Sequence, residues 1–331
     1  MRIDIHSHYM PESILADLGR IGDKCATPLE IRPDGKIFIH TPERPYGPVQ
    51  PTFYDLDLRL DFLRKHGIDK QVLTAPPFLF YYWSDSPEAH ALMTIENDAI
   101  AEAARKHPDR YIGFATVMLQ NVDASIAECR RTKALGIRGI EIGSNVNDVS
   151  LSDKKFWSFF EAVEALDMAI AIHPHNVYGR ELMDDFHLRN LIGFPADTTL
   201  AAVKLIFSGV MDKFPRLRIC LGQAGGFLPY IIGRLDTGYH ARPECRRNIP
   251  KPPSQYLRHF YYDTIIHSPN VAKFLIDSVG PDRLMLGTDF PFDMGARSPI
   301  ADLDAQRHLT AAQREQIDWR TANEFLRLGL T

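Results

Sequence analysis

Short apolar runs alternate with amphipathic stretches along most of this chain of 331 residues, and this alternation restricts the possible folds more than any other feature. β-branched or apolar runs occur at residues 3–5, 71–75, 111–117, 137–142, 168–172, 217–221, 260–264 and 284–287. Helical spacing of apolar residues is found at 56–66, 89–107, 122–135, 153–166, 198–214, 227–238, 271–279 and 311–328. Short buried strands followed by amphipathic helices are typical of βα units in a parallel sheet.

Eight strands alternating with eight helices predict an α/β fold of the (β/α)8 TIM-barrel type, although a doubly wound open sheet would alternate in the same way. Residues 9–55 break the alternation: they are rich in proline, and Asp34-Gly35 between two alternating apolar runs predicts a hairpin. We therefore expect one barrel domain over residues 1–331, with a small insertion at about 9–55 after strand 1. The insertion is expected to cover a pocket, with a linker or disordered loop as the alternative.

Composition and charge exclude several classes of partner. Hydrophobic residues make up 45% and charged residues 24% of the chain, as in soluble globular proteins with a sizeable core. The net charge of −4 is spread along the chain, so we expect no binding to nucleic acid or membranes, and a small-molecule partner instead. Scattered cysteines and the lack of a leader or of a membrane-spanning apolar run predict a cytoplasmic protein.

Two histidines lie at the end of the first predicted strand. In the run IDIHSH, His6 and His8 are two residues apart, so their side chains point to the same side of that strand. Neutral imidazole nitrogens are good ligands for divalent metals such as zinc, and a strand end holds them rigidly. The pair favours a metal site, with surface histidines as the alternative interpretation.

The same pattern recurs after two further strands. His173 follows the apolar run MAIAI, and Asp289 follows LMLGT, so each is placed where a barrel strand ends at the catalytic face. Taken singly, such a histidine is commonly a hydrogen-bonded core residue, and such an aspartate a turn or capping residue. Together with His6 and His8 they predict one divalent metal ion in an open catalytic site, zinc being favoured and manganese the alternative.

At these residues the chain resembles the amidohydrolase superfamily, and within it the branch of metal-dependent decarboxylases related to alpha-amino-beta-carboxymuconate-epsilon-semialdehyde decarboxylase. The resemblance covers nearly the whole chain. It is carried by IDIHSH, FYYWSD, GIRGIEIGSNVN, IHPHN, LIGFPADTT, QAGGFLPYIIGR, FYYDTIIH and LGTDFPF.

The resemblance implies the same four metal ligands, with Asp289 also catalytic. It implies that Arg234 binds a substrate carboxylate across a subunit boundary, and therefore that the protein is a homodimer. It places Phe292 and Trp83, the latter within FYYWSD, in the substrate pocket. The run IEIGS on strand four lacks a lysine that could be carbamylated, so one metal ion is expected rather than two.

The chain departs from the family pattern at four positions that we expect to line the pocket. Gln223 takes the catalytic position of a family histidine, where it cannot titrate but can hold a water or a substrate oxygen. Either the natural residue has been replaced here or the chemistry differs. Ile39 stands where a second substrate-binding arginine is expected. His175 and His187 replace two pocket tryptophans.

The resemblance predicts non-oxidative decarboxylation of a small conjugated or aromatic carboxylic acid, in the catabolism of aromatic compounds. Two alternatives remain open. One is a metal-dependent hydrolase of carbon–carbon, amide or ester bonds that uses a metal-activated water. The other is a catalytically silent protein that binds a ligand.

Overall fold

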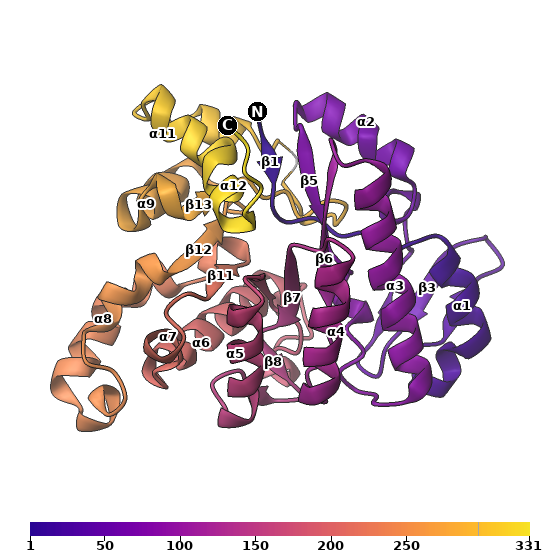
Figure 1. Ribbon diagram of the computed structural model, residues 1–331, viewed down its shortest axis with the longest axis horizontal. Coiled ribbons are helices and arrows are strands. Elements are labelled where there is room, and N and C mark those ends of the chain that lie inside the picture. The colour runs from indigo at the N-terminus through magenta and orange to yellow at the C-terminus, as the bar shows by residue number, and fades with distance from the viewer. Residues whose placement is uncertain (297) are drawn as a thin grey trace.

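The computed structural model describes residues 1–296 and 298–331. Its centre is an eight-stranded sheet in the order β1-β5-β6-β7-β10-β11-β12-β13 (Figure 1). Neighbouring strands pair in parallel. The strands are β1 (Ile3–Asp4), β5 (Lys70–Leu73), β6 (Tyr111–Thr116), β7 (Gly139–Gly143), β10 (Ala169–His173), β11 (Arg218–Leu221), β12 (Phe260–Asp263) and β13 (Leu284–Met285).

Residues just beyond the first and last strands close the sheet into a barrel. The Ile5 N–H donates to the Leu286 carbonyl at 2.8 Å, and Ser7 pairs in parallel with Phe290. The predicted parallel barrel is therefore confirmed. Strands one and eight are neighbours, so side chains at their carboxyl ends can reach a common point.

Helices surround the barrel (Figure 1). They are α2 (Leu56–His66), α3 (Pro87–Lys106), α4 (Val122–Ala134), α5 (Trp157–Ala165), α6 (Phe194–Phe207), α7 (Val210–Lys213), α8 (Leu228–Ala241), α9 (Pro269–Val279), α10 (Ala301–Asp304), α11 (Ala311–Glu315) and α12 (Thr321–Leu326). Within the described residues, none of the helices is both long enough and apolar enough to cross a membrane.

Two predicted helices are divided in the structure. The helix expected at 198–214 ends at Phe207, and α7 starts after Gly209, whose φ of 83° leaves the helical region. The helix expected at 311–328 is interrupted by a π-helical segment, Gln316–Arg320, between α11 and α12.

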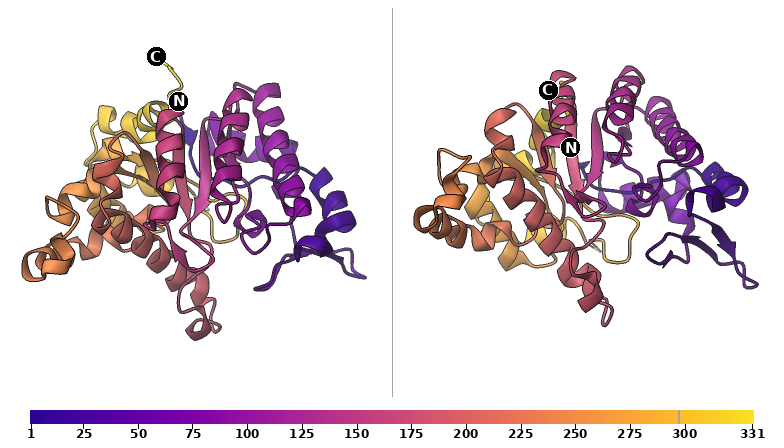
Figure 2. Two further views of the ribbon diagram at one scale, coloured as in Figure 1. Left: turned by 60° about the horizontal axis from the view of Figure 1, so that its bottom comes forward. Right: turned by 90° about the horizontal axis from the view of Figure 1, so that it is seen from below.

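The insertion after β1 folds as a small unit of its own. It contains α1 (Ser13–Ile21) and an antiparallel sheet of β2 (Leu29–Ile31), β3 (Ile37–His40) and β4 (Pro45–Tyr46). The predicted hairpin turn at Gly35 is present, and β4 adds a strand that was not predicted. The insertion and the segment after β10 both extend away from the two chain ends (Figure 2, left).

A buried polar network holds the end of β1 in place. Arg59 of α2 is fully buried, and its guanidinium donates to the His8 carbonyl and, at 2.8 Å, to Oε1 of Gln71. Gln71 donates in turn to Asp4, which also accepts the backbone N–H groups of His6 and Thr288. These contacts fix the backbone from which His6 and His8 project.

Candidate metal centre

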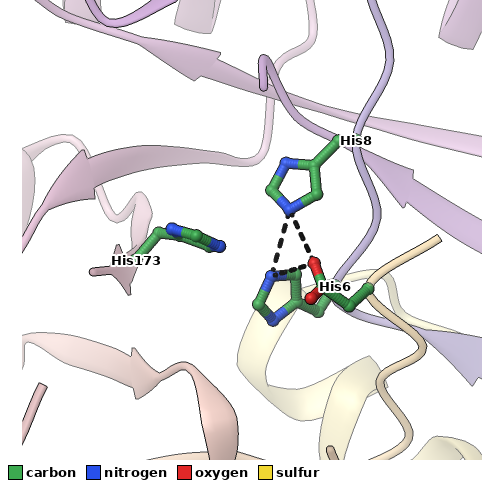
Figure 3. Close-up of side chains that lie close together, drawn as sticks. His6, His8 and His173 are labelled. Atoms are coloured by element: carbon green, nitrogen blue, oxygen red, sulfur yellow. Dashed lines mark hydrogen bonds and ion pairs between the residues drawn. The ribbon is translucent and has the colours of Figure 1, made fainter. Parts of the chain in front are cut away.

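Three imidazoles and one carboxylate meet at the carboxyl end of the barrel. His6 and His8 follow β1, His173 is the last residue of β10, and Asp289 lies four residues after β13. All four are buried, and one ligand atom from each lies within 4.8 Å of the others. His8 Nε2 is 3.2 Å from His6 Nε2 and 3.1 Å from Asp289 Oδ1 (Figure 3).

Acceptors behind each histidine determine which ring nitrogen carries the proton. His6 Nδ1 lies 2.8 Å from Oδ2 of the buried Asp263, and His173 Nδ1 lies 2.6 Å from the Pro174 carbonyl. His8 Nδ1 lies 3.2 Å from the Ala75 carbonyl. A carbonyl or an ionised carboxylate only accepts, so each Nδ1 donates and each Nε2 turns its lone pair toward the centre.

This arrangement fits a bound cation. The Nε2 atoms of His6 and His8 are both acceptors, and at 3.2 Å their lone pairs repel each other unless a positive charge lies between them. Two donors about 2.1 Å from one ion at roughly tetrahedral or octahedral angles are about 3.0–3.4 Å apart. His6, His8, His173 and Asp289 therefore have the chemistry and spacing of a site for one divalent metal.

The electrostatics of the metal-free centre lead to the same conclusion. Burial opposes charge on His6, but the hydrogen bond to Asp263 and the charge of Asp289 outweigh it and raise the pKa of His6 to about 9. Burial and the neighbouring histidines hold the pKa of His173 well below its usual value. A proton therefore occupies the centre at neutral pH when no metal is bound, and metal uptake displaces it.

A cavity of about 390 Å³ opens beside this centre. This size suits a small-molecule ligand. His173 and Asp289 line it, and the insertion supplies much of the remaining wall, as predicted. Aromatic side chains are prominent among the other lining residues, which include Tyr46, Phe53, Phe78, Phe194 and Phe292.

Three of the predicted pocket residues line this cavity. Phe292 packs its ring against His8, with centroids 5.0 Å apart, and His175 and His187 contribute from the segment that follows β10. Trp83 does not line the cavity. Its ring lies behind His175, and its Nε1 donates to the Cys25 carbonyl at 2.9 Å.

The expectation that Ile39 lines the pocket is wrong. Ile39 lies on β3 with none of its surface exposed, within an apolar cluster between the insertion and α3. Arg44, in the turn between β3 and β4, lines the cavity instead. Its guanidinium lies 4.9 Å from the ring centroid of Tyr46, and no carboxylate oxygen of the described residues comes within 4.0 Å of it.

Gln223 and Arg234 lie outside the cavity wall. The Gln223 backbone N–H donates to the same Asp263 oxygen that accepts from His6, while its Oε1 is buried and has no hydrogen-bond partner among the described residues. Gln223 thus adjoins the metal centre through Asp263, and its place in the substrate pocket stays a prediction. Arg234 is exposed on α8.

Sequence reasoning missed two residues of the site. Asp263 ends β12, so its place at the end of an apolar run was a signal of the same kind as that of Asp289. Arg44 lies in the proline-rich insertion, where no regular period marks which side chains face a pocket. Only the packing of the insertion against the barrel reveals it.

Comparison with known proteins places the chain among enzymes of one family. It is 33% identical to 2-amino-3-carboxymuconate-6-semialdehyde decarboxylase of Dictyostelium discoideum, over 99% of this chain and 92% of that protein. It is 28% identical to gamma-resorcylate decarboxylase of a Polaromonas species, over 87% and 92% of the two chains.

A solved structure is also similar throughout. The 5-carboxyvanillate decarboxylase of Novosphingobium aromaticivorans, determined with manganese and 4-hydroxy-3-methoxy-5-nitrobenzoic acid, has a TM-score of 0.82 and 25% identity, covering 99% of this chain and 96% of that one. The amidohydrolase family model matches residues 3–328. The chain therefore belongs to the amidohydrolase family.

Proposed function

We propose that the protein is a metal-dependent, non-oxidative decarboxylase of a small aromatic or conjugated carboxylic acid. The observation that carries this proposal is the convergence of three imidazole lone pairs and a carboxylate beside a cavity lined by aromatic rings. Relatives that span nearly the whole chain are named as decarboxylases of such acids, which supports the same activity.

His6, His8, His173 and Asp289 would hold the metal ion. We propose zinc, because three imidazoles and one carboxylate suit it, although manganese is bound in the similar solved structure. When bound, the ion supplies positive charge that stabilises the negative charge developing as carbon dioxide leaves.

Aromatic side chains and one arginine would hold the substrate. Phe292 packs against Phe53 and Phe78, with centroids 5.1 Å and 6.3 Å away, and these rings present flat apolar surfaces beside His8. A planar conjugated acid can pack on such surfaces. Arg44 has no carboxylate partner among the described residues and lines the same cavity, so we assign it the role of binding a carboxylate of the substrate.

The titratable groups at the centre favour decarboxylation over hydrolysis. Breaking the bond to the carboxylate leaves an electron pair on carbon, and one proton must then reach that carbon. Asp289 Oδ2, which makes no hydrogen bond to the described residues, can relay this proton from a water molecule in the cavity. Hydrolysis needs both a base for water and an acid for the leaving group, whereas decarboxylation needs a single proton donor, and the amide of Gln223 can supply none of these roles.

We also propose that two copies of the chain form a homodimer. Tyr230 and Arg234 on α8 continue the helical spacing that starts at its N-cap residue, Phe227, and Tyr230 is 81% exposed. This helix lies at the edge of the molecule (Figure 1, lower left). Since Arg234 does not line the cavity of its own chain, the substrate-binding role that the family resemblance implies for it requires a second copy.

We place the protein in the cytoplasm. All four cysteines are free, and three of them are buried. Unpaired thiols persist where the compartment is reducing, whereas secreted proteins tend to pair them.

Replacing His173 with Ala should abolish stoichiometric metal binding, because it removes one of four converging donors. Elemental analysis of the purified protein should find about one divalent ion per chain in the wild type and far less in the variant. His107→Ala, at the end of α3, is the control and should keep its metal. Equal metal content in all three proteins would refute the assignment of the site.

The metal-loaded protein should release carbon dioxide from aromatic or conjugated carboxylic acids. The relatives suggest gamma-resorcylate and 5-carboxyvanillate as first substrates. Evolved carbon dioxide and the decarboxylated product are measured together, before and after removal of the metal by a chelator. Hydrolysis of esters or amides without any release of carbon dioxide would contradict the proposal.

Replacing Arg44 with Ala should raise the KM for the acid substrate by about tenfold or more, because a charge-assisted hydrogen bond contributes roughly 1.5–3 kcal/mol. Arg44→Lys should recover part of this loss, since it keeps the charge without the planar fork. Arg32→Ala is the matched control, because Arg32 lies in the neighbouring turn of the same three-stranded sheet and pairs with Glu30. An unchanged KM in Arg44→Ala would exclude this role.

Light scattering should report a particle of about 75 kDa, twice the chain mass of 37.6 kDa. Tyr230→Glu should convert it to the monomer, because it buries a charge in the proposed interface. Leu58→Glu changes a half-exposed apolar residue on α2 and should leave the dimer intact. A wild-type protein that is monomeric at all concentrations would exclude the homodimer.

A further inference from the structure

A buried imidazole in the cavity wall makes no hydrogen bond to the part of the chain that the structure describes. His175 lines the cavity and is only 9% exposed. Its Nδ1 is sealed from solvent and, like its Nε2, has no hydrogen-bond partner among the described residues. Nε2, the ring nitrogen that is not sealed, is therefore left to bond a partner in the cavity from outside the chain.

Aromatic rings from the FYYWSD motif surround this imidazole. The ring centroids of Phe80, Tyr82 and Trp83 lie 5.4, 5.5 and 6.1 Å from that of His175. The Tyr82 hydroxyl accepts from the Gly143 N–H at 2.9 Å, and Trp83 Nε1 donates to the Cys25 carbonyl. The polar atoms of these rings are therefore engaged elsewhere, and none of them satisfies His175.

The backbone that carries His175 is held from behind. Asp197 of α6 accepts a hydrogen bond from the His175 backbone and another from the Ser144 hydroxyl. Asn145 donates from Nδ2 to the Asn176 carbonyl at 2.6 Å. At Gly143 a Cβ would lie 3.3 Å from the His175 Cβ, so β7 packs directly against this segment. The position of the imidazole is thus set before any ligand binds.

The burial of the two ring nitrogens indicates which one meets the cavity. Nδ1 has no solvent contact, so the polar atom of the ring that a ligand can reach is Nε2. A buried N–H without a partner is costlier and rarer than an acceptor that lacks one of its contacts. The neutral ring therefore places its proton on Nε2 and presents a hydrogen-bond donor to the cavity.

We propose that His175 is a specificity-determining residue that donates from Nε2 to an oxygen substituent of the substrate. This inference rests on the proposed function and narrows its substrate class to carboxylic acids that bear a hydroxyl, methoxy or carbonyl oxygen on the conjugated system. A phenylalanine at this position would offer the same flat surface without a donor.

Binding of matched probes to the metal-loaded protein tests this proposal without requiring turnover. Calorimetric titration compares benzoate with 2-, 3- and 4-hydroxybenzoate and their methoxy analogues. At least one oxygen-bearing acid should bind the wild type about three- to tenfold more tightly than benzoate. His175→Phe should remove this preference while still binding benzoate, and His175→Gln, which keeps an N–H donor, should retain part of it.

His107→Phe, a histidine substitution outside the cavity, should keep the wild-type preference. His175→Leu is measured in parallel with His175→Phe, because phenylalanine fills more space than imidazole. The preference for oxygen-bearing acids is judged in the variant that still binds benzoate. A wild type with no preference for oxygen-bearing acids, or a preference that survives in these variants, overturns the proposal. A His175-dependent preference in a protein that releases no carbon dioxide would sustain it while refuting the proposed activity.

Discussion

Repulsion between imidazole lone pairs at the mouth of the barrel is the constraint on which the rest of the site depends. The carboxylate of Asp263 and the backbone carbonyls behind His8 and His173 hold each Nδ1–H, so three Nε2 atoms face one another. Such an arrangement requires positive charge at the centre, which a proton supplies in the metal-free protein and a metal ion would supply when bound. The acceptors behind the imidazoles are therefore as much a part of the metal centre as the four converging side chains.

Closure of the barrel brings these groups together. Asp289 and the two histidines after β1 meet only because the segment after β13 pairs with the segment after β1. Arg59 contributes from outside the barrel, since its buried guanidinium donates to the His8 carbonyl and links to Asp4 through Gln71. A charge in this position stabilises one backbone geometry, because its hydrogen bonds cannot be exchanged for water.

The sequence allowed prediction of the parts of the site that depend on strand order alone. His6, His8, His173 and Asp289 each follow a buried run, and a parallel barrel brings all such positions to one face. The positions of Ile39 and Arg44 depend on how the insertion packs on that face. The local spacing of apolar residues in the sequence does not indicate this packing. The break at Gly209 and the π-helical segment Gln316–Arg320 were missed for a related reason, since apolar spacing continues across both.

Charged and uncharged side chains line different parts of the cavity. The metal ligands and Arg44 concentrate charge, whereas burial lowers the pKa of His175 to about 4 and leaves its ring uncharged at neutral pH. A neutral hydrogen-bonding group distinguishes substrate substituents by their geometry and by the free-energy cost of leaving a polar atom unpaired. Because such a group keeps its charge state near neutral pH, this discrimination does not change with pH there. The charged part can therefore bind the carboxylate that every substrate shares, while the neutral wall distinguishes one acid from another.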